Sequence, residues 1–279
     1  MSQIPIPPAV VRDAVSRTLA EDVGPGDLSL AAVPADKEVT AAIVARSNGI
    51  LCGRPFAEEV FTQLGGARVD WLCGEGELME PGREVAHLSG PAGVLLTGER
   101  AALNLLQTLS GTATSVAEMT RAVTGTGVRI LDTRKTLPGL RSPQKYAVRV
   151  GGGHNHRHGL FDGVLLKENH LAWAGGLEPA VAAAREQAPH TARIQLEVES
   201  LEQMRQAIAA GVEALLLDNF PLDDLRTAVT ECPAGVFLEA SGNIHLGNVR
   251  QVAETGVDGI SSGALTRDLT SLDLSMRFA

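Results

Sequence analysis

The sequence predicts an α/β protein, in which a mixed α+β domain precedes a parallel β/α barrel. Six strand-like apolar runs follow one another in the second part of the chain, and helical patterns lie between the later ones. The last four runs begin 21–23 residues apart, the length of one strand–loop–helix–loop unit. The segments around Gly211 and Gly256, 45 residues apart, also resemble each other, each with a helix-ending glycine before a strand.

The first part mixes helices and short strands. A helix is expected after a Pro-Pro pair, because apolar residues recur at helical spacing as far as Leu19, and GPGD (24–27) ends it. Another helix is expected at about 54–64, where Gly65-Gly66 ends it. A long apolar-periodic stretch (98–123) leads into the second part. Strands are expected at EVTAAIVAR (38–46), ARVDWLC (67–73) and EVAHLSG (84–90).

The second part contains strand-like runs that are apolar almost throughout. Such runs are typical of strands buried on both faces, as in parallel sheets covered by helices. Six strands are counted, so an eightfold closed barrel is not predicted. The runs are VRILD (128–132), DGVLLK (162–167), RIQLEV (193–198), ALLLD (214–218), GVFLEA (235–240) and DGISSG (258–263).

Composition excludes several classes of function. A formal charge of −9 argues against a long footprint on DNA, and only six Phe, two Trp and one Tyr argue against stacking platforms for single-stranded nucleic acid. The three cysteines form no CxxC, which indicates reduced, buried thiols. The start of the chain lacks a secretory pattern, and no run approaches the ~18 apolar residues of a membrane span. We therefore expect a cytoplasmic protein without membrane or nucleic-acid partners.

Cations gather in one window of this acidic chain. Residues 129–170 hold eight Lys/Arg, three Asp/Glu and four of the seven histidines around the segment GGGHNHRHG (151–159). Three interpretations compete: zinc bound by His154, His156 and His158, a solvated His-rich loop, or a pocket for carboxylates. The glycines, which allow close approach of the backbone, and the cations together favour the carboxylate pocket.

Polar residues follow every strand of the second part. Because the carboxyl ends of barrel strands meet at one rim, these residues predict a site there. Glu197 and Asp218 could hold Mg²⁺ through a phosphorylated substrate, or could instead form a structural salt bridge with Lys167. The Gly-Ser segments after the last two strands suit a phosphate. The strand-end residues are 132–135, 167–170, Glu197 with Glu199, 218–219, 239–243 and 261–263.

These motifs resemble those of a known family. The segments DTRKTLPGLR, GGGHNHR, KENH, LEVES, LLLDNF and LEASGNI are similar to those of the nicotinate-nucleotide pyrophosphorylases, also called quinolinate phosphoribosyltransferases. The likeness runs from LAEDVGPGDLS to the last residue. It implies an N-terminal α/β domain (1–110), an incomplete, open α/β barrel (111–270) packed with it, and a C-terminal segment (271–279) returning to the first domain. It also implies a homodimer in which each N-terminal domain caps its neighbour's barrel.

The resemblance implies a reaction in NAD biosynthesis. Quinolinate and phosphoribosyl pyrophosphate would give nicotinate mononucleotide, CO₂ and pyrophosphate, with Mg²⁺ and no organic cofactor. The quinolinate carboxylates would meet Arg134, His156, Arg157 and Lys167, together with Arg100 from the other subunit. Lys135 would face the donor phosphates, and Glu197 and Asp218 would hold Mg²⁺ and the ribose hydroxyls. The implied catalytic residues are Lys135, Lys167, Glu197 and Asp218, and the phosphoribosyl site would be lined by Thr133, Ser241, Gly242, Asn243, Ser262, Gly263 and Ala264.

Two departures from the family pattern and two alternatives stand beside this interpretation. Arg267 occupies a position where many members carry His, so a cation is retained toward the donor phosphate. His158 replaces a usual apolar residue and is assigned no role. The alternatives are a molybdenum-transport-associated relative, which would lack the full GGGHNHR and KENH signature, and a non-catalytic anion-binding or metal-sensing module, which would not need Glu197 and Asp218.

Overall fold

The computed structural model describes residues 4–279 and divides into two compact units. The first unit comprises residues up to 117 together with 136–152 and 268–279, and the second comprises 118–135 and 153–267. The segment 136–152 therefore groups with the first unit, although the expected boundary at 110/111 assigns it to the barrel. In the described part of the chain, no helix combines the length and apolar character that crossing a membrane requires.

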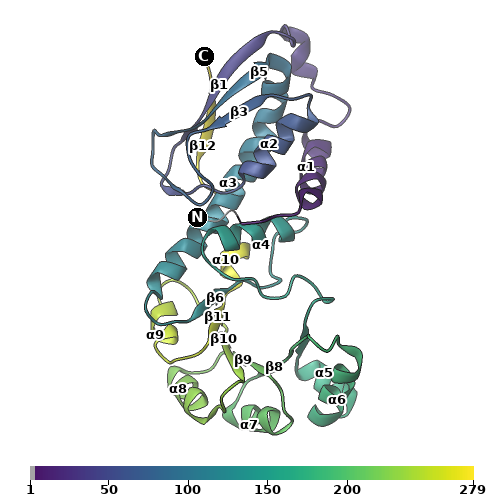
Figure 1. Cartoon of the computed structure of the whole chain (residues 1–279), viewed down its shortest axis with the longest axis vertical. Helices are drawn as coiled ribbons and strands as arrows, with labels where there is room; N and C mark the ends of the chain where they lie inside the picture. The colour runs from purple at the N-terminus through teal and green to yellow at the C-terminus, as the bar shows by residue number, and fades with distance from the viewer. Residues whose placement is uncertain (1–3) are drawn as a thin grey trace. The chain divides into compact units, whose positions relative to one another are not determined.

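The first unit is built on an antiparallel sheet of order β12-β1-β5-β3. The C-terminal strand β12 pairs with β1, from Ala41 opposite Phe278 to Ala45 opposite Leu274. Large apolar side chains such as Phe56 and Phe61 are fully buried in its core. Figure 1 shows α2 and α3 running alongside this sheet. The strands are β1 (Glu38–Ala45), β3 (Arg68–Trp71), β5 (Glu84–Pro91) and β12 (Leu274–Phe278), with β2 (Gly49–Ile50) and β4 (Leu78–Met79) forming a separate pair; the helices are α1 (Pro8–Asp22), η1 (Leu28–Ala32), α2 (Arg54–Gln63), α3 (Ala92–Ala122) and α4 (Arg141–Val150).

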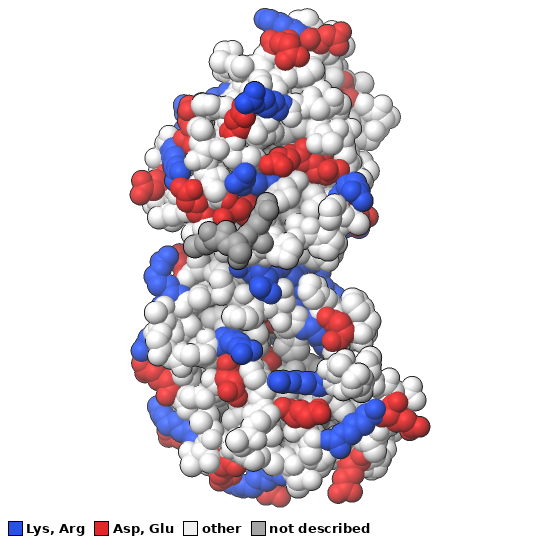
Figure 2. All heavy atoms as spheres, in the orientation of Figure 1, with Lys and Arg blue, Asp and Glu red and all other residues white. Residues whose placement is uncertain are grey.

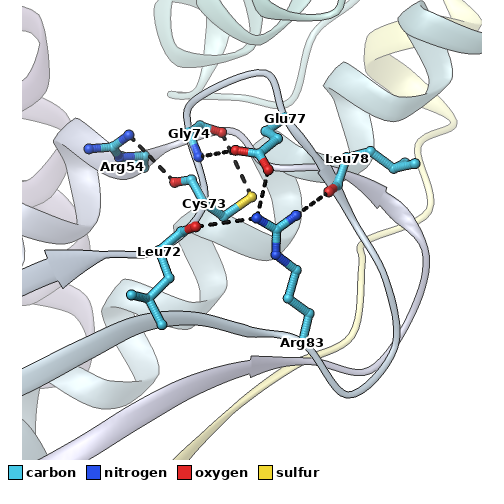
Figure 3. A network of polar contacts seen from close by, with 7 residues as sticks. All are labelled: Arg54, Leu72, Cys73, Gly74, Glu77, Leu78 and Arg83. Atoms are coloured by element: carbon cyan, nitrogen blue, oxygen red, sulfur yellow. Dashed lines mark hydrogen bonds and ion pairs between the residues drawn. The ribbon is translucent and has the colours of Figure 1, made fainter.

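The cysteines are free thiols. Cys52 and Cys73 are buried as expected, whereas Cys232 is partly exposed. Figure 3 shows Cys73 in a loop that Arg83 ties together, with the guanidinium donating to the carbonyl groups of Leu72 (3.2 Å) and Leu78 (3.0 Å) and to Glu77 (2.6 Å). Burial, followed by the nearby Glu77 charge, raises the pKa of Cys73 to about 11. This thiol therefore stays protonated near neutral pH and serves packing rather than nucleophilic chemistry.

Gly151, the first glycine of GGGHNHRHG, ends α4 in close contact with α3. A Cβ placed on it would lie 2.4 Å from the carbonyl oxygen of Ala113 and 2.8 Å from Cβ of Val116. Its φ of −73° is open to any residue, so only space requires glycine here. The close approach that was expected of these glycines is, at Gly151, the approach of one helix to another.

Gly151→Ala is expected to lower the free energy of unfolding by about 1–3 kcal/mol, because a methyl group forced against backbone requires the helices to separate. Urea unfolding followed by fluorescence measures the change. The control is Gly247→Ala, where the nearest atoms, at 3.2 Å, belong to the movable ring of exposed His245. Equal unfolding midpoints for the two variants would show that the contact at Gly151 is unimportant.

The second unit is an open parallel sheet of order β6-β11-β10-β9-β8-β7. From β7 the strands follow chain order to β11, and β6 then pairs with β11. Between residues 4 and 279 no pairing joins β6 to β7, so the barrel is incomplete, and the predicted fold class is confirmed. The strands are β6 (Arg129–Leu131), β7 (Val164–Leu166), β8 (Ile194–Val198), β9 (Ala214–Asp218), β10 (Phe237–Ser241) and β11 (Gly259–Ser261).

Helices surround the outer side of this sheet, as Figure 1 shows for α5 to α9. The predicted left-handed glycines are confirmed, with φ values of +74° at Gly211 and +94° at Gly256. One sheet face carries buried apolar residues such as Leu196, Leu215 and Leu238. The helices are α5 (Glu168–Ala174), α6 (Leu177–Gln187), α7 (Leu201–Ala209), α8 (Leu222–Glu231), α9 (Val249–Ala253) and α10 (Ala264–Arg267).

Strands β8, β9 and β10 are largely buried on both faces, as predicted, but the other face mixes polar side chains with apolar ones. Glu197 and Glu239 both lie level with Leu216 of the strand between them, so these three side chains share one face. Gln195 precedes Glu197 by two residues and Asp218 follows Leu216 by two. Because side chains alternate along a strand, both lie on the same face. This arrangement aims four polar residues from three strands into the interior of the open barrel.

Candidate active site

The inner sheet face joins two of the predicted site residues directly. Lys167 follows β7, and its ammonium group forms an ion pair and hydrogen bond with Oε2 of Glu197 on β8. The Lys167 side chain is 45% exposed and that of Glu197 is 19% exposed, so the pair faces solvent at the carboxyl end of the sheet. This is the salt bridge that the structural alternative predicts for Glu197.

Asp218 has a different partner. Its Oδ2 accepts a hydrogen bond from Nδ2 of Asn219 (2.9 Å). Asn219 has a left-handed φ of 56°, and its main-chain N–H donates to the carbonyl oxygen of Ser241 (2.9 Å), which extends the pairing of β9 with β10. The carboxylates of Glu197 and Asp218 thus come from neighbouring strands, one held by a cation and the other by an amide.

The loop after β10 is locked onto Asn219. Nδ2 of Asn243 donates to Oδ1 of Asn219 (3.3 Å), and Asn243 is also left-handed, with a φ of 50°. Gly242 has a φ of +95°, and a Cβ there would lie 2.2 Å from Oδ1 of Asn219. The expected phosphoribosyl residues Ser241, Gly242 and Asn243 therefore form one unit with Asp218. Asn219 joins this unit through its hydrogen bonds. The sequence alone does not suggest this role, which becomes evident only once the left-handed backbone of Asn219 is known.

The loops after β6 and β11 also meet. The Lys135 side chain passes over Gly263, where an added Cβ would lie 2.7 Å from Cδ of the lysine. Oγ1 of Thr133 accepts the main-chain N–H of Lys135 (3.0 Å), which shapes this loop. The hydroxyl of Ser262 is buried and donates to the carbonyl oxygen of Ile244 (2.8 Å), so it supports the loop after β10. Ala264 and Arg267 lie on the short helix α10 that follows.

The segment around His156 lies along the open edge of β6. His154 forms a parallel bridge with Leu131, its N–H donating to Ile130 (2.8 Å). Asp132, expected at the rim, is instead fully buried: Oδ1 accepts the N–H of His156 (2.8 Å) and Oδ2 accepts from Nδ2 of Asn155 (2.6 Å). This carboxylate therefore fixes the backbone that carries His156 and Arg157.

Arg157 is a partly buried cation beside a second one. Nη1 of Arg157 donates to the carbonyl oxygen of Gly163 (3.0 Å). Burial and then the charge of Arg134 lower the pKa of Arg157, whereas Asp162 raises it by a smaller amount. Arg157 is partly buried and Arg134 is exposed, and the two lie close enough for the charge of Arg134 to act on Arg157. The predicted pair of Arg134 and Arg157 is thus brought together.

Both ring nitrogens of His156 contact the protein. Nδ1 accepts the main-chain N–H of Arg157 (2.7 Å), and Nε2 lies 2.9 Å from Oε1 of Gln195. Nε2 of Gln195 donates in turn to Oε2 of Glu239 (2.8 Å), which lies 3.4 Å from Nε2 of His156. Sequence reasoning missed Gln195 and placed Glu239 only among the strand-end residues at the rim, without a partner. The available signal for Gln195 is its place two residues before Glu197 in RIQLEV, which puts both side chains on the same face of a strand.

The histidine-rich segment offers no zinc cluster. Across the described residues, no three His, Cys, Asp or Glu side chains are grouped so that they could hold a metal. The N–H groups of His158 and Gly159 donate to the two carboxylate oxygens of Asp162, at 2.8 and 2.9 Å, which closes a turn. The zinc interpretation of His154, His156 and His158 therefore has no support in the described structure.

The remaining predicted residue, Arg100, lies apart in the chain. It is exposed on α3, within the first unit. That unit also contains a hollow of ≈ 960 Å³ lined by residues including Arg54, Glu75 and Tyr146, but by none of the predicted site residues. Figure 2 shows basic and acidic side chains close together around a hollow in the surface of the second unit. All other predicted site residues belong to this second unit.

Comparison with known proteins adds the family context. Residues 27–110 match the model of the quinolinate phosphoribosyl transferase N-terminal domain, and residues 112–277 match that of its C-terminal domain. A Bacillus subtilis protein named probable nicotinate-nucleotide pyrophosphorylase [carboxylating] is 44% identical over 92% of this chain and 89% of its own length. The human nicotinate-nucleotide pyrophosphorylase [carboxylating] is 40% identical over 98% and 93%. The solved structure of the Francisella tularensis nicotinate-nucleotide pyrophosphorylase superposes with a TM-score of 0.94 at 40% identity, covering 100% of both chains.

Proposed function

The chain belongs to the quinolinate phosphoribosyltransferase family, and from that premise we propose how its own residues carry out the reaction. It is an enzyme that transfers the phosphoribosyl group of phosphoribosyl pyrophosphate to quinolinate, with decarboxylation to nicotinate mononucleotide in NAD biosynthesis. The observation that carries the proposal is the inner sheet face, where the Lys167–Glu197 pair and Asp218 come from adjacent strands.

The cations bind the two carboxylates of quinolinate. Arg134 is close enough for its charge to disfavour the charge of Arg157, and Lys167 lies at the carboxyl end of the same sheet. A dicarboxylate relieves this repulsion, and each charge-assisted hydrogen bond contributes about 1.5–3 kcal/mol. His156 supports this group through the main chain of Arg157, because its Nδ1 accepts that N–H.

The donor occupies the loops at the ends of β6, β10 and β11. Lys135, which passes over Gly263, faces the phosphate groups, and Arg267 on α10 supplies a further cation toward them. The left-handed backbone of Gly242 and Asn243 turns main-chain groups of that loop toward the phosphoribosyl group. Thr133, Ser241 and Ala264 complete the surface of this subsite.

Glu197 and Asp218 suit magnesium. They supply hard carboxylate oxygens from neighbouring strands, and no third acidic or histidine ligand is grouped with them in the described residues. Mg²⁺ keeps most of its waters and is held in such sites by one or two carboxylates and substrate oxygens, so two protein ligands fit. When bound, the ion would neutralise charge on the pyrophosphate leaving group.

Bond breaking at the anomeric carbon builds positive charge on the ribose, as in glycoside chemistry. Glu197 and Asp218 stabilise that charge, and Lys167 keeps Glu197 oriented through the ion pair. After the ring nitrogen of quinolinate has bonded to the ribose, it is a fixed cation. The electron pair of the broken C–CO₂ bond stays on the carbon beside that cation, and a proton then replaces CO₂. The substrate supplies the electron sink, so no organic cofactor takes part.

A homodimer completes the site in this proposal. Arg100 is exposed, and the resemblance assigns it to the carboxylate pocket of the neighbouring subunit. Leu160, Phe161 and Trp173 of the second unit are 73%, 83% and 90% exposed, and a partner subunit would remove such large apolar side chains from water. A cytoplasmic location and the absence of nucleic-acid partners stay predictions from composition.

Mixed dimers test the shared site. Arg100→Ala and Lys167→Ala chains are each expected to be nearly inactive as homodimers. A heterodimer places one intact Arg100 beside one intact Lys167, so one of its two sites is complete. About a quarter to a half of the wild-type activity per dimer is therefore expected to return. Tandem-tag purification isolates the heterodimer for assay, and a heterodimer as inactive as either parent would count against sharing.

The direct test is incubation with quinolinate, phosphoribosyl pyrophosphate and Mg²⁺, with release of CO₂ and formation of the mononucleotide both followed. Equal amounts of the two products are expected. Binding of quinolinate without any turnover would instead favour the anion-binding module. Omitting Mg²⁺ in the presence of a chelator is expected to stop product formation.

A further inference from the structure

A buried chain of hydrogen bonds runs beneath the carboxylate pocket. It begins at Glu239 on β10, passes through Gln195 on β8 and His156, and ends at the main-chain N–H of Arg157. Glu239 is 2% exposed and Gln195 is 7% exposed. Neither residue carries a role in the reaction described above.

Burying the Glu239 carboxylate costs free energy, so a contribution to stability does not explain why this residue is present. Its Oε1 is buried and has no hydrogen-bond partner among residues 4–279. A buried carboxylate with half of its acceptors unused destabilises a fold, and an apolar side chain of similar volume is often at least as stable. The contacts made by the other oxygen therefore point to a functional reason for this carboxylate.

At every step of this series of hydrogen bonds, only one of the two groups can be the donor. The N–H of Arg157 can only donate, so Nδ1 of His156 accepts and the ring hydrogen lies on Nε2. That hydrogen needs an acceptor, which is Oε1 of Gln195 at 2.9 Å. The Gln195 amide must then turn its NH₂ group toward Glu239, whose carboxylate can only accept. The donor and acceptor of each hydrogen bond therefore follow from the Arg157 N–H at one end, which can only donate, and the Glu239 carboxylate at the other, which can only accept.

We propose that Gln195 and Glu239 are positioning residues that hold His156 as its Nε2–H tautomer and thereby fix the Arg157 backbone at the quinolinate pocket. The expected effect on quinolinate KM rests on the proposed function, whereas the expected tautomer of His156 does not. The expected consequence is on quinolinate binding, because neither residue reaches the bond-breaking site through these contacts. Phosphoribosyl pyrophosphate binding is expected to stay unchanged.

Exchange of the two side chains tests the direction of the chain. Gln195→Glu alone sets one carboxylate against another across 2.8 Å and is expected to raise KM for quinolinate at least tenfold. In the double variant Q195E/E239Q, the new amide on β10 donates to the new carboxylate on β8, which still accepts from His156. The KM of this variant is therefore expected to return to within about threefold of wild type. Glu239→Gln retains one acceptor oxygen and is expected to stay within about threefold. The value of kcat is expected to change less than threefold throughout.

A spectrum of ligand-free protein provides a readout independent of activity. The ¹⁵N shifts of the His156 ring, assigned by their loss in His156→Asn, are expected to show hydrogen on Nε2 in wild type and in Q195E/E239Q. Mixed tautomers are expected in Glu239→Met, which removes the acceptor at similar size. Gln187→Met, at an exposed position, is the control and is expected to leave both readouts unchanged.

Two results would overturn the proposal: equal KM values for Q195E and Q195E/E239Q, or an unchanged His156 spectrum in Glu239→Met. The exchange keeps volume and net charge, so it remains decisive even if Glu239→Met fails to fold. If wild type does not convert quinolinate at all, the proposed function fails, whereas the spectra still decide whether Gln195 and Glu239 orient His156.

Discussion

Asp218→Asn is expected to lower kcat for the quinolinate reaction by about 10²–10³-fold, the size typical of removing one group that stabilises charge in a transition state. Asparagine keeps the shape of the side chain and an oxygen that can accept from Nδ2 of Asn219, so the loop around Asn243 should stay in place. Only the negative charge is lost. The effect is therefore expected in kcat rather than in quinolinate binding, which depends on cations from other strands.

Steady-state kinetics with both substrates saturating measures the loss, and calorimetry with quinolinate alone measures binding. Asp223→Asn is the matched control, because the Asp223 side chain is 94% exposed and forms a surface ion pair with Arg226, three residues along α8. Its kcat is expected to equal that of wild type. An Asp218→Asn enzyme with full kcat would remove the case for a carboxylate acting on the ribose and the metal.

The second large effect concerns the dicarboxylate pocket. Arg157→Ala is expected to weaken quinolinate binding at least tenfold, because about 1.5–3 kcal/mol is lost with one charge-assisted hydrogen bond, or roughly 10- to 150-fold in affinity. Lys167→Ala is expected to do at least as much. It removes a cation and also leaves the Glu197 carboxylate, now without its ion-pair partner, to repel a dianion.

Calorimetric titration at constant ionic strength decides between a specific pocket and general attraction. The control is Arg205→Ala, which also removes an ion-paired cation, since Arg205 contacts Glu231 at 2.9 Å with its side chain 53% exposed. If Arg157→Ala, Lys167→Ala and Arg205→Ala all weaken quinolinate binding to the same extent, the charge of the whole chain rather than the pocket determines affinity. Wild-type affinity in Arg157→Ala alone would exclude this guanidinium as a ligand.

The order of elements could be predicted because the signals are local. The apolar run at 214–218 coincides with β9, and the run at 193–198 differs from β8 by one residue. The role of Gln195 was missed, and Glu239 was placed only at the rim, since the sequence alone does not show which side chain a polar residue in an apolar run will contact. His156, their partner, is 39 residues from Gln195, and no periodicity connects positions so far apart.

The site residues could be named from the sequence, but most of their contacts could not, and the Lys167–Glu197 ion pair was predicted only as an alternative to a magnesium site. Motif similarity identified Lys167 and Glu197 as members of one site, whereas their ion pair depends on the neighbouring positions of β7 and β8. Asp132 follows a strand just as a rim residue would, and only the folded segment at His156 buries it. The role of Gly151 likewise depends on the proximity of α3, which no local pattern contains.

Strand β11 gives β6 its only strand neighbour in the sheet of the second unit as described, although about 130 residues separate them in the chain. A ribosome-bound chain therefore exposes β6 as an unpaired edge until residues 259–261 have emerged, while β7 to β10 can already assemble. Strand β12 joins the sheet of the first unit later still, beside β1. A molecule without residues 259–278 would leave β6 and one edge of β1 without a strand partner, and unpaired strand edges promote association with other chains.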